Sequence, residues 1–261
     1  MGAIENAAEV QAVMRESFEL NRPIKEQTME RVALITAAGS GLGAACAREL
    51  ANAGFRVAVS SSSGKGEQLG RELGGLGLTG SNTSIDDVAR IVKQTCEAYG
   101  RIDVVVNSCG AVPKGDLLAI SDQDWHSALD MILLSVIRIA RAVTPVFEKI
   151  GGGTIINVST YSTFEPDLAF PVSSSLRAAL GSFAKLYSDR YADKNIRMNN
   201  VLSGYVPTRW PEQEEIKQRI PMRRYGTAKE FAKTVAFLAS DGAGYITGQN
   251  IRVDGGLTRS F

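Results

Sequence analysis

The chain has 261 residues, of which 44% are hydrophobic and 22% charged, and this composition indicates a globular protein with one large core. A formal net charge of +1, no apolar run long enough to cross a bilayer and no signal peptide argue against nucleic acid and membranes as partners and favour a cytoplasmic protein. One histidine and three widely spaced cysteines argue against a metal site and against a disulfide framework.

The first predicted strand is preceded by an N-terminal extension, residues 1–29, and the domain itself spans residues 30–261. Within the extension, residues 9–20 carry apolar side chains at helical spacing, and Pro23 follows them. We therefore expect a helix here, packed on the domain or on a neighbouring subunit. A partly ordered extension is the alternative.

The stretch from Val32 to Gly43 is a short apolar run followed by a glycine-rich turn, and residues 44–51 continue it with helical character. A strand, a glycine turn and a helix in this order form the part of a parallel sheet that receives a dinucleotide. Gly41 and Gly43 let the backbone approach a pyrophosphate, and the helix start offers free N–H groups to its charge. The sequence therefore predicts a dinucleotide site at this turn.

A second strand is predicted at residues 54–59, and a serine-rich loop follows at residues 60–66. NAD sites have an acidic residue at this point for the ribose hydroxyls, and this loop has none. Ser61, Ser62 and Lys65 are instead suited to a 2′-phosphate, which favours NADP over NAD as the cofactor. The alternative is a flexible loop without a ligand role.

The rest of the chain alternates between helical and strand patterns without an internal repeat. Helices are predicted at residues 84–99, 125–147, 173–191 and 228–240. Strands are predicted at residues 102–107, 153–159, 195–202 and 249–256. Such alternation predicts an α/β fold with a doubly wound parallel sheet in a single domain.

Several motifs, in order and at the expected spacing, resemble the short-chain dehydrogenase/reductase family from residue 30 to the C-terminus. They include Thr36–Gly43, with Ala37 in place of the family's first glycine, and the stretch from Gly100 to Gly110. Residues 155–159 resemble the strand before the family's catalytic serine, and residues 224–256 contain its C-terminal signature. The resemblance implies a Rossmann-like fold, a nicotinamide cofactor, a small-molecule substrate and oxidoreductase activity.

The resemblance also implies which positions surround the cofactor. They belong to the glycine turn, the ends of three strands, the helix at residues 173–191 and the loop after residue 203. The implied cofactor residues are Thr36, Gly39, Ser40, Gly41, Leu42, Gly43, Ser61, Ser62, Lys65, Asn107, Gly110, Arg177, Gly204, Val206 and Thr208.

The catalytic positions differ from the family pattern of Asn, Ser, Tyr and Lys. Aligning Arg177-Ala-Ala-Leu with the family's Lys-Ala-Ala-Leu places Ile132, Thr160, Ser173 and Arg177 at the four positions. Ser173 is short, and its alcohol does not ionise near neutral pH. Thr160 keeps a hydroxyl donor, Arg177 can bond a ribose but cannot act as a base, and Ile132 has no polar group. We therefore expect an active site without the family's proton relay.

Nearby groups can replace the missing acid or base if burial shifts their pKa. Tyr161 and Tyr205 are candidates, as are Glu165 and Asp167 on the segment that faces the site. The alternative is that the two tyrosines only line the pocket and that the two acids are solvated loop residues. Cys109 is expected near the cofactor as a small packed residue.

Three functions remain open. The first is an NADP-dependent oxidoreductase that acts on a small carbonyl or alcohol by non-standard proton transfer. The second is a non-redox enzyme on the same scaffold, such as a lyase, isomerase or dehalogenase, in which Arg177 binds an anion. The third is an inactive nucleotide-binding subunit. The family also implies a homodimer or homotetramer, assembled through the helices predicted at residues 125–147 and 173–191.

Overall fold

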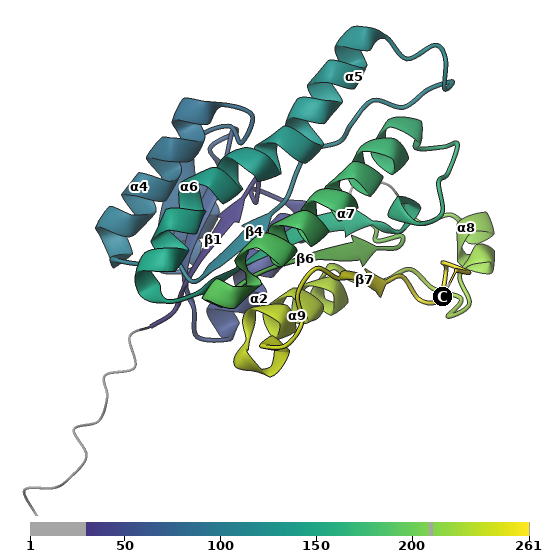
Figure 1. The fold of residues 1–261 in the computed structure, drawn as a ribbon. Coiled ribbons are helices and arrows are strands. Elements are labelled where there is room, and N and C mark those ends of the chain that lie inside the picture. The colour runs from purple at the N-terminus through teal and green to yellow at the C-terminus, as the bar shows by residue number, and fades with distance from the viewer. Residues whose placement is uncertain (1–29, 209–210, 261) are drawn as a thin grey trace, which may run out of the picture. The chain divides into compact units, whose positions relative to one another are not determined.

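The computed structural model describes residues 30–208 and 211–260, and the helix predicted at residues 9–20 lies outside them. Within these residues, seven strands form one parallel sheet in the order β3-β2-β1-β4-β5-β6-β7 (Figure 1). The strands are β1 (Val32–Thr36), β2 (Arg56–Ser61), β3 (Leu76–Thr79), β4 (Val104–Asn107), β5 (Gly153–Thr160), β6 (Ile196–Ser203) and β7 (Asn250–Val253).

Helices cover both faces of the sheet (Figure 1). Helices α2 and α9 share one apolar core with the sheet, and α4, α6 and α7 share the other. The helices are α2 (Gly41–Asn52), α3 (Lys65–Glu72), α4 (Ile85–Tyr99), α5 (Asp122–Leu129), α6 (Ser135–Ile150), α7 (Pro171–Tyr191), α8 (Glu214–Arg219) and α9 (Ala228–Ala239). This arrangement confirms the predicted doubly wound α/β fold.

Strands β1 and β4 are almost entirely apolar because helices cover both faces of the sheet. Every residue of β1, β4 and β6 is buried. The strand order reverses beside β1, which pairs with β2 on one side and with β4 on the other. In open parallel sheets, ligands bind outside the carboxyl ends of the strands at such a reversal. The fold therefore places the site at the ends of β1 and β4.

Helix α8 and the neighbouring pair of elements α3 and β3 were not predicted from the sequence. The segment predicted as a serine loop at residues 60–66 contains the end of β2 and the start of α3, and β3 follows. Both elements are rich in glycine, so they carry little periodic hydrophobic signal. A Cβ added at Gly70 of α3 would lie 2.5 Å from the Cα of Gly77 in β3. This close packing requires glycine, which is why the pair has no apolar pattern.

The single helix predicted at residues 125–147 is also interrupted. Between α5 and α6 the chain forms a π-helical turn, η1 (Asp130–Leu134), and Arg138 bonds the Asp130 carboxylate across it at 2.5 Å. Turns of this kind often lie at functional sites. This one contains Ile132, which is 2% exposed and packs in the core with α4, α6 and α7.

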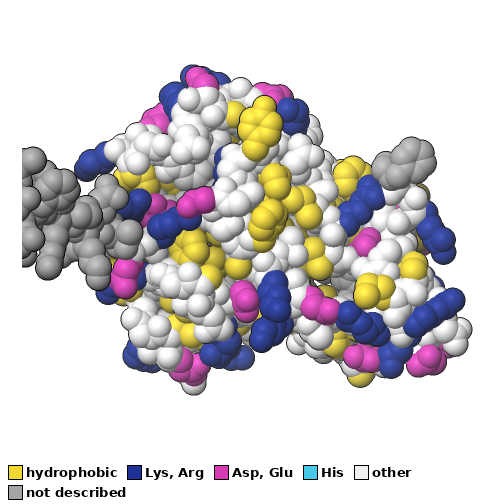
Figure 2. Space-filling view, turned by 90° about the horizontal axis from the view of Figure 1, so that it is seen from below, with side chains coloured by type: hydrophobic (Ala, Val, Ile, Leu, Met, Phe, Trp, Pro, Cys, Tyr) yellow, Lys and Arg dark blue, Asp and Glu magenta, His cyan; other side chains and the backbone are white. Residues whose placement is uncertain are grey.

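Charged side chains of both signs lie among one another on the face seen in Figure 2, with hydrophobic side chains gathered near its middle. In the described part of the chain, no helix combines the length and the apolar character that a membrane span requires.

Candidate nucleotide and substrate site

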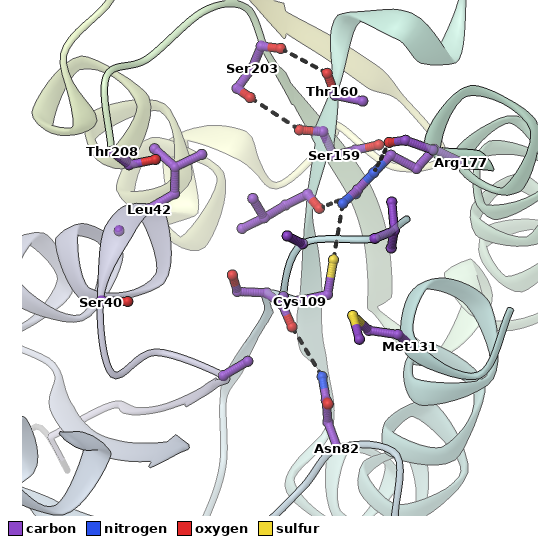
Figure 3. A pocket seen from close by; sticks show the side chains of 18 of the residues that line it. Ser40, Leu42, Asn82, Cys109, Met131, Ser159, Thr160, Arg177, Ser203 and Thr208 are labelled. Carbon is purple, nitrogen blue, oxygen red and sulfur yellow. Dashed lines mark hydrogen bonds between the residues drawn. The ribbon is translucent and has the colours of Figure 1, made fainter. Parts of the chain in front are cut away.

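A cavity of about 570 Å³ opens at the carboxyl ends of the central strands. One half is formed by the glycine turn before α2 and by the residues after β2 and β3. The other half is formed by the ends of β5 and β6, by α7 and by the segment after β4 (Figure 3). The cavity therefore joins the predicted nucleotide turn to the predicted catalytic positions.

Glycines in the turn before α2, residues 39–43, leave a stretch of bare backbone, which forms a cradle at the cavity. Gly41 has a φ of +61°, and a Cβ added to it would lie 3.7 Å from Thr208 of the loop after β6. A Cβ at Gly39 would lie 2.8 Å from the Cβ of Lys65, and one at Gly43 would lie 2.9 Å from the backbone of residue 38. Gly39 and Gly43 therefore have no room for a Cβ, and the left-handed backbone at Gly41 favours glycine; at Gly39 and Gly41 the bare backbone faces the cavity.

The start of α2 presents its backbone N–H groups to this cradle. Ser40 occupies the N-cap position, and its side chain makes no capping hydrogen bond in the described structure. The first N–H groups of a helix have no partner within the helix, and they carry partial positive charge. Both features fit a diphosphate, which is an anion that accepts several N–H hydrogen bonds.

The end of β2 offers hydroxyl groups to the cavity. Ser61 and Ser62 both line it, and Ser61 is buried and accepts the backbone N–H of Gly66 at 2.8 Å. Lys65 is exposed and does not line the cavity, but its Cβ lies against the Gly39 backbone. Among the described residues that line the whole cavity there is no aspartate or glutamate.

Four of the implied cofactor residues do not line the cavity: Thr36, Gly43, Lys65 and Asn107. The Thr36 hydroxyl donates to the Asn107 side chain at 3.3 Å, and both residues are buried. Asn107 donates in turn to Asn157 at 3.1 Å, which donates to Asn200 at 2.8 Å. These side chains cross β1, β4, β5 and β6 in register, so they hold the strand ends together beneath the cavity. The remaining implied cofactor residues all line it.

Arg177 crosses from α7 to the segment after β4 (Figure 3). It donates from Nε to Ser173 Oγ at 3.2 Å, from Nη1 to the Val158 carbonyl at 2.7 Å and from Nη2 to Cys109 Sγ at 3.0 Å. These bonds use three of the five N–H donors of the guanidinium and leave two for a ligand. Cys109 is thus a partner of Arg177 and not only a packed residue.

Three of the four aligned catalytic positions come together at the cavity wall. Thr160, Ser173 and Arg177 all line the cavity, whereas Ile132 lies in the core behind it. The Thr160 hydroxyl donates to the carbonyl of residue 203 at 3.4 Å. Ser173 is 9% exposed, and since it accepts from Arg177 its own proton is free to point to a ligand.

Tyr161 and Tyr205 also line the cavity, and their hydroxyl oxygens are 2.9 Å apart. The Tyr161 hydroxyl donates to Asp167 at 2.7 Å, so its oxygen accepts from Tyr205. Burial, the hydrogen bond with Tyr205 and the Asp167 carboxylate raise the pKa of Tyr161 far above its ordinary value. Tyr161 is therefore held neutral, and it is not a base near neutral pH.

The two acids of the same segment do not line the cavity. Burial acts to raise the pKa of Asp167, but hydrogen bonds from a backbone N–H and from Tyr161, with the Arg219 guanidinium 3.7 Å away, outweigh it and lower the pKa. Glu165 accepts the backbone N–H groups of residues 259 and 260. Both carboxylates thus organise their loops, and neither is a solvated charge without a partner.

Several residues that line the cavity were not identified from the sequence. Asn82 follows β3 and donates to the Ser108 carbonyl at 3.1 Å, so it was missed together with that strand (Figure 3). Ser159 precedes Thr160 and adds a further hydroxyl. Lys114 and Phe170 lie on the loops over the substrate half, with the ammonium 4.5 Å from the ring centre. Of these residues, only Ser159 could have been identified from the sequence, because it is a hydroxyl residue directly before Thr160.

Comparison with known proteins finds a family of reductases. A family model described as enoyl-(acyl carrier protein) reductase matches residues 36–258. The 3-oxoacyl-(acyl-carrier-protein) reductase of Synechocystis sp. is 33% identical over 238 residues, which cover 87% of this chain and 96% of the relative. The corresponding reductase of Thermotoga maritima is 32% identical over 239 residues, covering 87% and 97%.

A human protein is also similar to this chain. Dehydrogenase/reductase SDR family member 4 of Homo sapiens is 31% identical over 247 residues, which cover 89% of each chain. The family match, these relatives and the seven-stranded parallel sheet agree. The chain therefore belongs to the short-chain dehydrogenase/reductase family.

Proposed function

We propose that this chain is an NADP(H)-dependent oxidoreductase that acts on a small carbonyl or alcohol. In this proposal, Ile132, Thr160, Ser173 and Arg177 occupy the positions of the family's Asn, Ser, Tyr and Lys. The observation that carries the proposal is that one cavity joins the bare start of α2 to the Ser173–Arg177 pair.

The cradle before α2 supports a nucleotide diphosphate, and the end of β2 supports NADP in particular. Ser61 and Ser62 present hydroxyl groups there, and the exposed Lys65, whose Cβ lies against Gly39, is placed so that its side chain can extend towards a 2′-phosphate. A carboxylate would repel a 2′-phosphate, and none lines the described part of the cavity. When bound, NADPH supplies a hydride to the substrate.

The chain's own polar groups would then orient the substrate oxygen. Thr160 and Ser173 offer hydroxyl donors to that oxygen, and the Arg177 guanidinium polarises the Ser173 hydroxyl by donating to its Oγ. Neither alcohol is an acid near neutral pH, so the proton comes from water. We expect a rate that is about 10²–10⁴-fold below that of a site with a positioned acid.

A non-redox function is the second candidate. The charged residues among those described at the cavity are Lys114 and Arg177, both positive, and hydroxyl groups lie beside Arg177. This electrostatic arrangement favours an anionic ligand such as a carboxylate or a halide. A lyase, isomerase or dehalogenase that stabilises an anion would use the same residues without hydride transfer.

Nucleotide titration followed by hydride-transfer assays tests the proposal. NADP⁺ is expected to bind more tightly than NAD⁺, and a panel of ketones and aldehydes is expected to oxidise NADPH above background. Ser62→Asp should weaken NADP⁺ binding about tenfold or more by placing a carboxylate near the 2′-phosphate. Ser127→Asp, which adds the same charge to an exposed position on α5, is the control.

The outcomes separate the candidates. Failure of both nucleotides to bind overturns the proposal and leaves the non-redox function. Binding of NADPH without reduction of any carbonyl also overturns it, and it identifies a nucleotide-binding subunit without redox activity.

We also propose that the chain assembles as a homodimer or homotetramer through α6 and α7. Ala178 and Ala179 are exposed on α7, and Leu186 is 65% exposed further along the same helix. Small and apolar residues at the surface of a helix allow close packing with a second helix. Sedimentation of a monomer at micromolar concentration would overturn this assembly. The described cysteines are all free thiols, which supports a reducing, cytoplasmic compartment.

A further inference from the structure

A second cavity, of about 250 Å³, lies at the opposite edge of the sheet from the nucleotide cavity. It is formed at the amino ends of β4, β5 and β6 and beside the end of α9. Its charged lining residues are Arg31, Arg101, Arg197, Asp103 and Asp241. Three guanidinium groups therefore face two carboxylates around one opening.

Two of the three arginines have a carboxylate partner. Arg101 binds Asp103 through two hydrogen bonds, of 2.9 and 2.5 Å, and Arg31 lies 3.0 Å from Asp241. Within residues 30–208 and 211–260, Arg197 has no carboxylate partner. Asp241 acts on the charge of Arg197 but is bonded to Arg31, so Arg197 is the arginine of this cavity without a bonded carboxylate among the described residues.

Arg197 is 8% exposed, so this charge without a bonded carboxylate is buried. Its guanidinium donates to the carbonyls of residues 246 and 238, at 3.2 and 2.9 Å. These bonds occupy two of its five N–H donors. The bond to residue 238 also covers a carbonyl in the last turn of α9, where the helix dipole would otherwise repel an anion. Burial and the nearby Arg31 lower the pKa of Arg197 and outweigh the Asp241 carboxylate, which acts to raise it.

A buried hydroxyl without a partner lies beside this cation. Thr154 lines the cavity and is 1% exposed, and its Oγ1 has no hydrogen-bond partner in the described structure. Thr154 of β5 pairs in register with Arg197 of β6, so both side chains leave the sheet on the same face. A buried polar group without a partner is costly, and a ligand that accepts its proton removes the cost.

We propose that this cavity binds a small oxyanion, a phosphate or carboxylate group, between Arg197 and the Thr154 hydroxyl. Such an anion supplies the missing negative charge and accepts hydrogen bonds from both groups. A volume of about 250 Å³ admits an anion of this size together with several waters, each of which takes about 30 Å³. The inference is independent of the proposed function because Thr154 does not line the nucleotide cavity.

The test is a titration of the full chain with inorganic phosphate at constant ionic strength. Binding is measured by calorimetry and by the change in melting temperature. Thr154→Val removes the hydroxyl and keeps the shape, and Thr154→Ser restores the hydroxyl. The wild type and Thr154→Ser are expected to bind phosphate saturably and to melt at higher temperature with it. Thr154→Val is expected to bind about tenfold more weakly.

Thr154→Val is also expected to melt at the same temperature as the wild type, or higher, in buffer without phosphate, because it removes an unpartnered buried hydroxyl. All three proteins keep the nucleotide cradle, so any phosphate binding there is the same in each. The difference in phosphate affinity between Thr154→Val and Thr154→Ser therefore reports the second cavity alone. Equal phosphate binding by the three proteins would overturn the proposal, and so would the absence of saturable binding. Neither result depends on whether a nucleotide binds.

Discussion

Arg177 lies one helical turn after Ser173 on α7, and its Nε donates to the Ser173 Oγ at 3.2 Å. Residues four apart on a helix share a face, so the spacing of the family's Tyr and Lys is kept while the side chains differ. A guanidinium stays protonated, and an alcohol stays neutral. The pair can thus hold and polarise a ligand oxygen, but it cannot exchange a proton as a phenol and an amine do.

The first prediction concerns Arg177. Arg177→Met should weaken NADP⁺ binding about tenfold or more, since hydrogen bonds from a charged group contribute about 1.5–3 kcal/mol each. Titration of the two proteins by calorimetry measures the change. Arg141→Met removes the same charge from an exposed position on α6 and is expected to bind NADP⁺ as the wild type does. Equal affinities for Arg177→Met and the wild type would show that Arg177 serves Val158 and Cys109 alone.

The second prediction concerns Ala37, which has a φ of +48° where the family has glycine. A left-handed backbone costs a residue with a Cβ about 1–2 kcal/mol, and glycine loses about 0.5–1 kcal/mol of extra entropy on folding. Ala37→Gly is therefore expected to raise the free energy of unfolding by about 0.5–1 kcal/mol. Urea denaturation measures it.

The control for this prediction is the adjacent residue. Ala38 is fully buried and is not among the described residues with positive φ, so Ala38→Gly should destabilise the protein by about 1 kcal/mol. The opposite signs at two neighbouring alanines are the result to look for. If both glycine variants were destabilised alike, the strain at Ala37 would be refuted.

The sequence allowed the central strands and the glycine turn to be predicted because their signals are local. Apolar runs such as Val104–Asn107 need no partner to be recognised, and Gly41 marks a backbone position that requires glycine. Alignment to a family motif also predicted Thr36 and Asn107 as cofactor residues. The motif could not predict that both side chains lie outside the cavity and bond each other. It gives the position of a residue along its strand but not the face of the sheet to which the side chain points.

The role of Tyr161 could not be predicted for a different reason. Its hydroxyl is fixed by Asp167, six residues later, and by Tyr205, which comes from the loop after β6. Contacts of this kind depend on how two loops meet, and no spacing in the sequence encodes that. The sequence indicated Tyr161 as a substitute acid or base, and the raised pKa of its hydroxyl makes it a weaker acid than a free tyrosine.

The third prediction follows from this pair of tyrosines. Tyr161→Phe removes one hydrogen-bond donor from the Asp167 carboxylate and should lower the free energy of unfolding by about 1–2 kcal/mol. The pKa of Asp167 should rise because a hydrogen bond that lowers it is lost, and NMR titration measures this. Tyr205→Phe, which leaves the bond to Asp167 intact, is the matched control and should have the smaller effect on both quantities. A pKa of Asp167 that rose more in Tyr205→Phe would contradict the assigned direction of the bonds.

The fourth prediction is a pH dependence at the start of α9. Glu230 binds Arg224 at 2.6 and 2.9 Å and closes a capping box with the backbone N–H and hydroxyl of Thr227. The Arg224 bond, followed by those from Thr227, lowers the pKa of Glu230 from 4.5 to about 2. A carboxylate with a lowered pKa stabilises the fold above its unfolded pKa, and the stabilisation is lost as the pH falls through the folded pKa.

Glu230→Gln should therefore be less stable than the wild type at neutral pH, and the difference should shrink as the pH falls from 4.5 towards about 2. Glutamine still accepts the backbone N–H of Thr227, so the difference reports the charge and not the loss of the cap. Chemical denaturation at a series of pH values measures it. Glu215→Gln removes the same charge from an exposed position on α8 and is expected to follow the wild-type curve. A difference that grew on acidification would reverse the sign required by a lowered pKa, and it would show that the Arg224 bond does not form in solution.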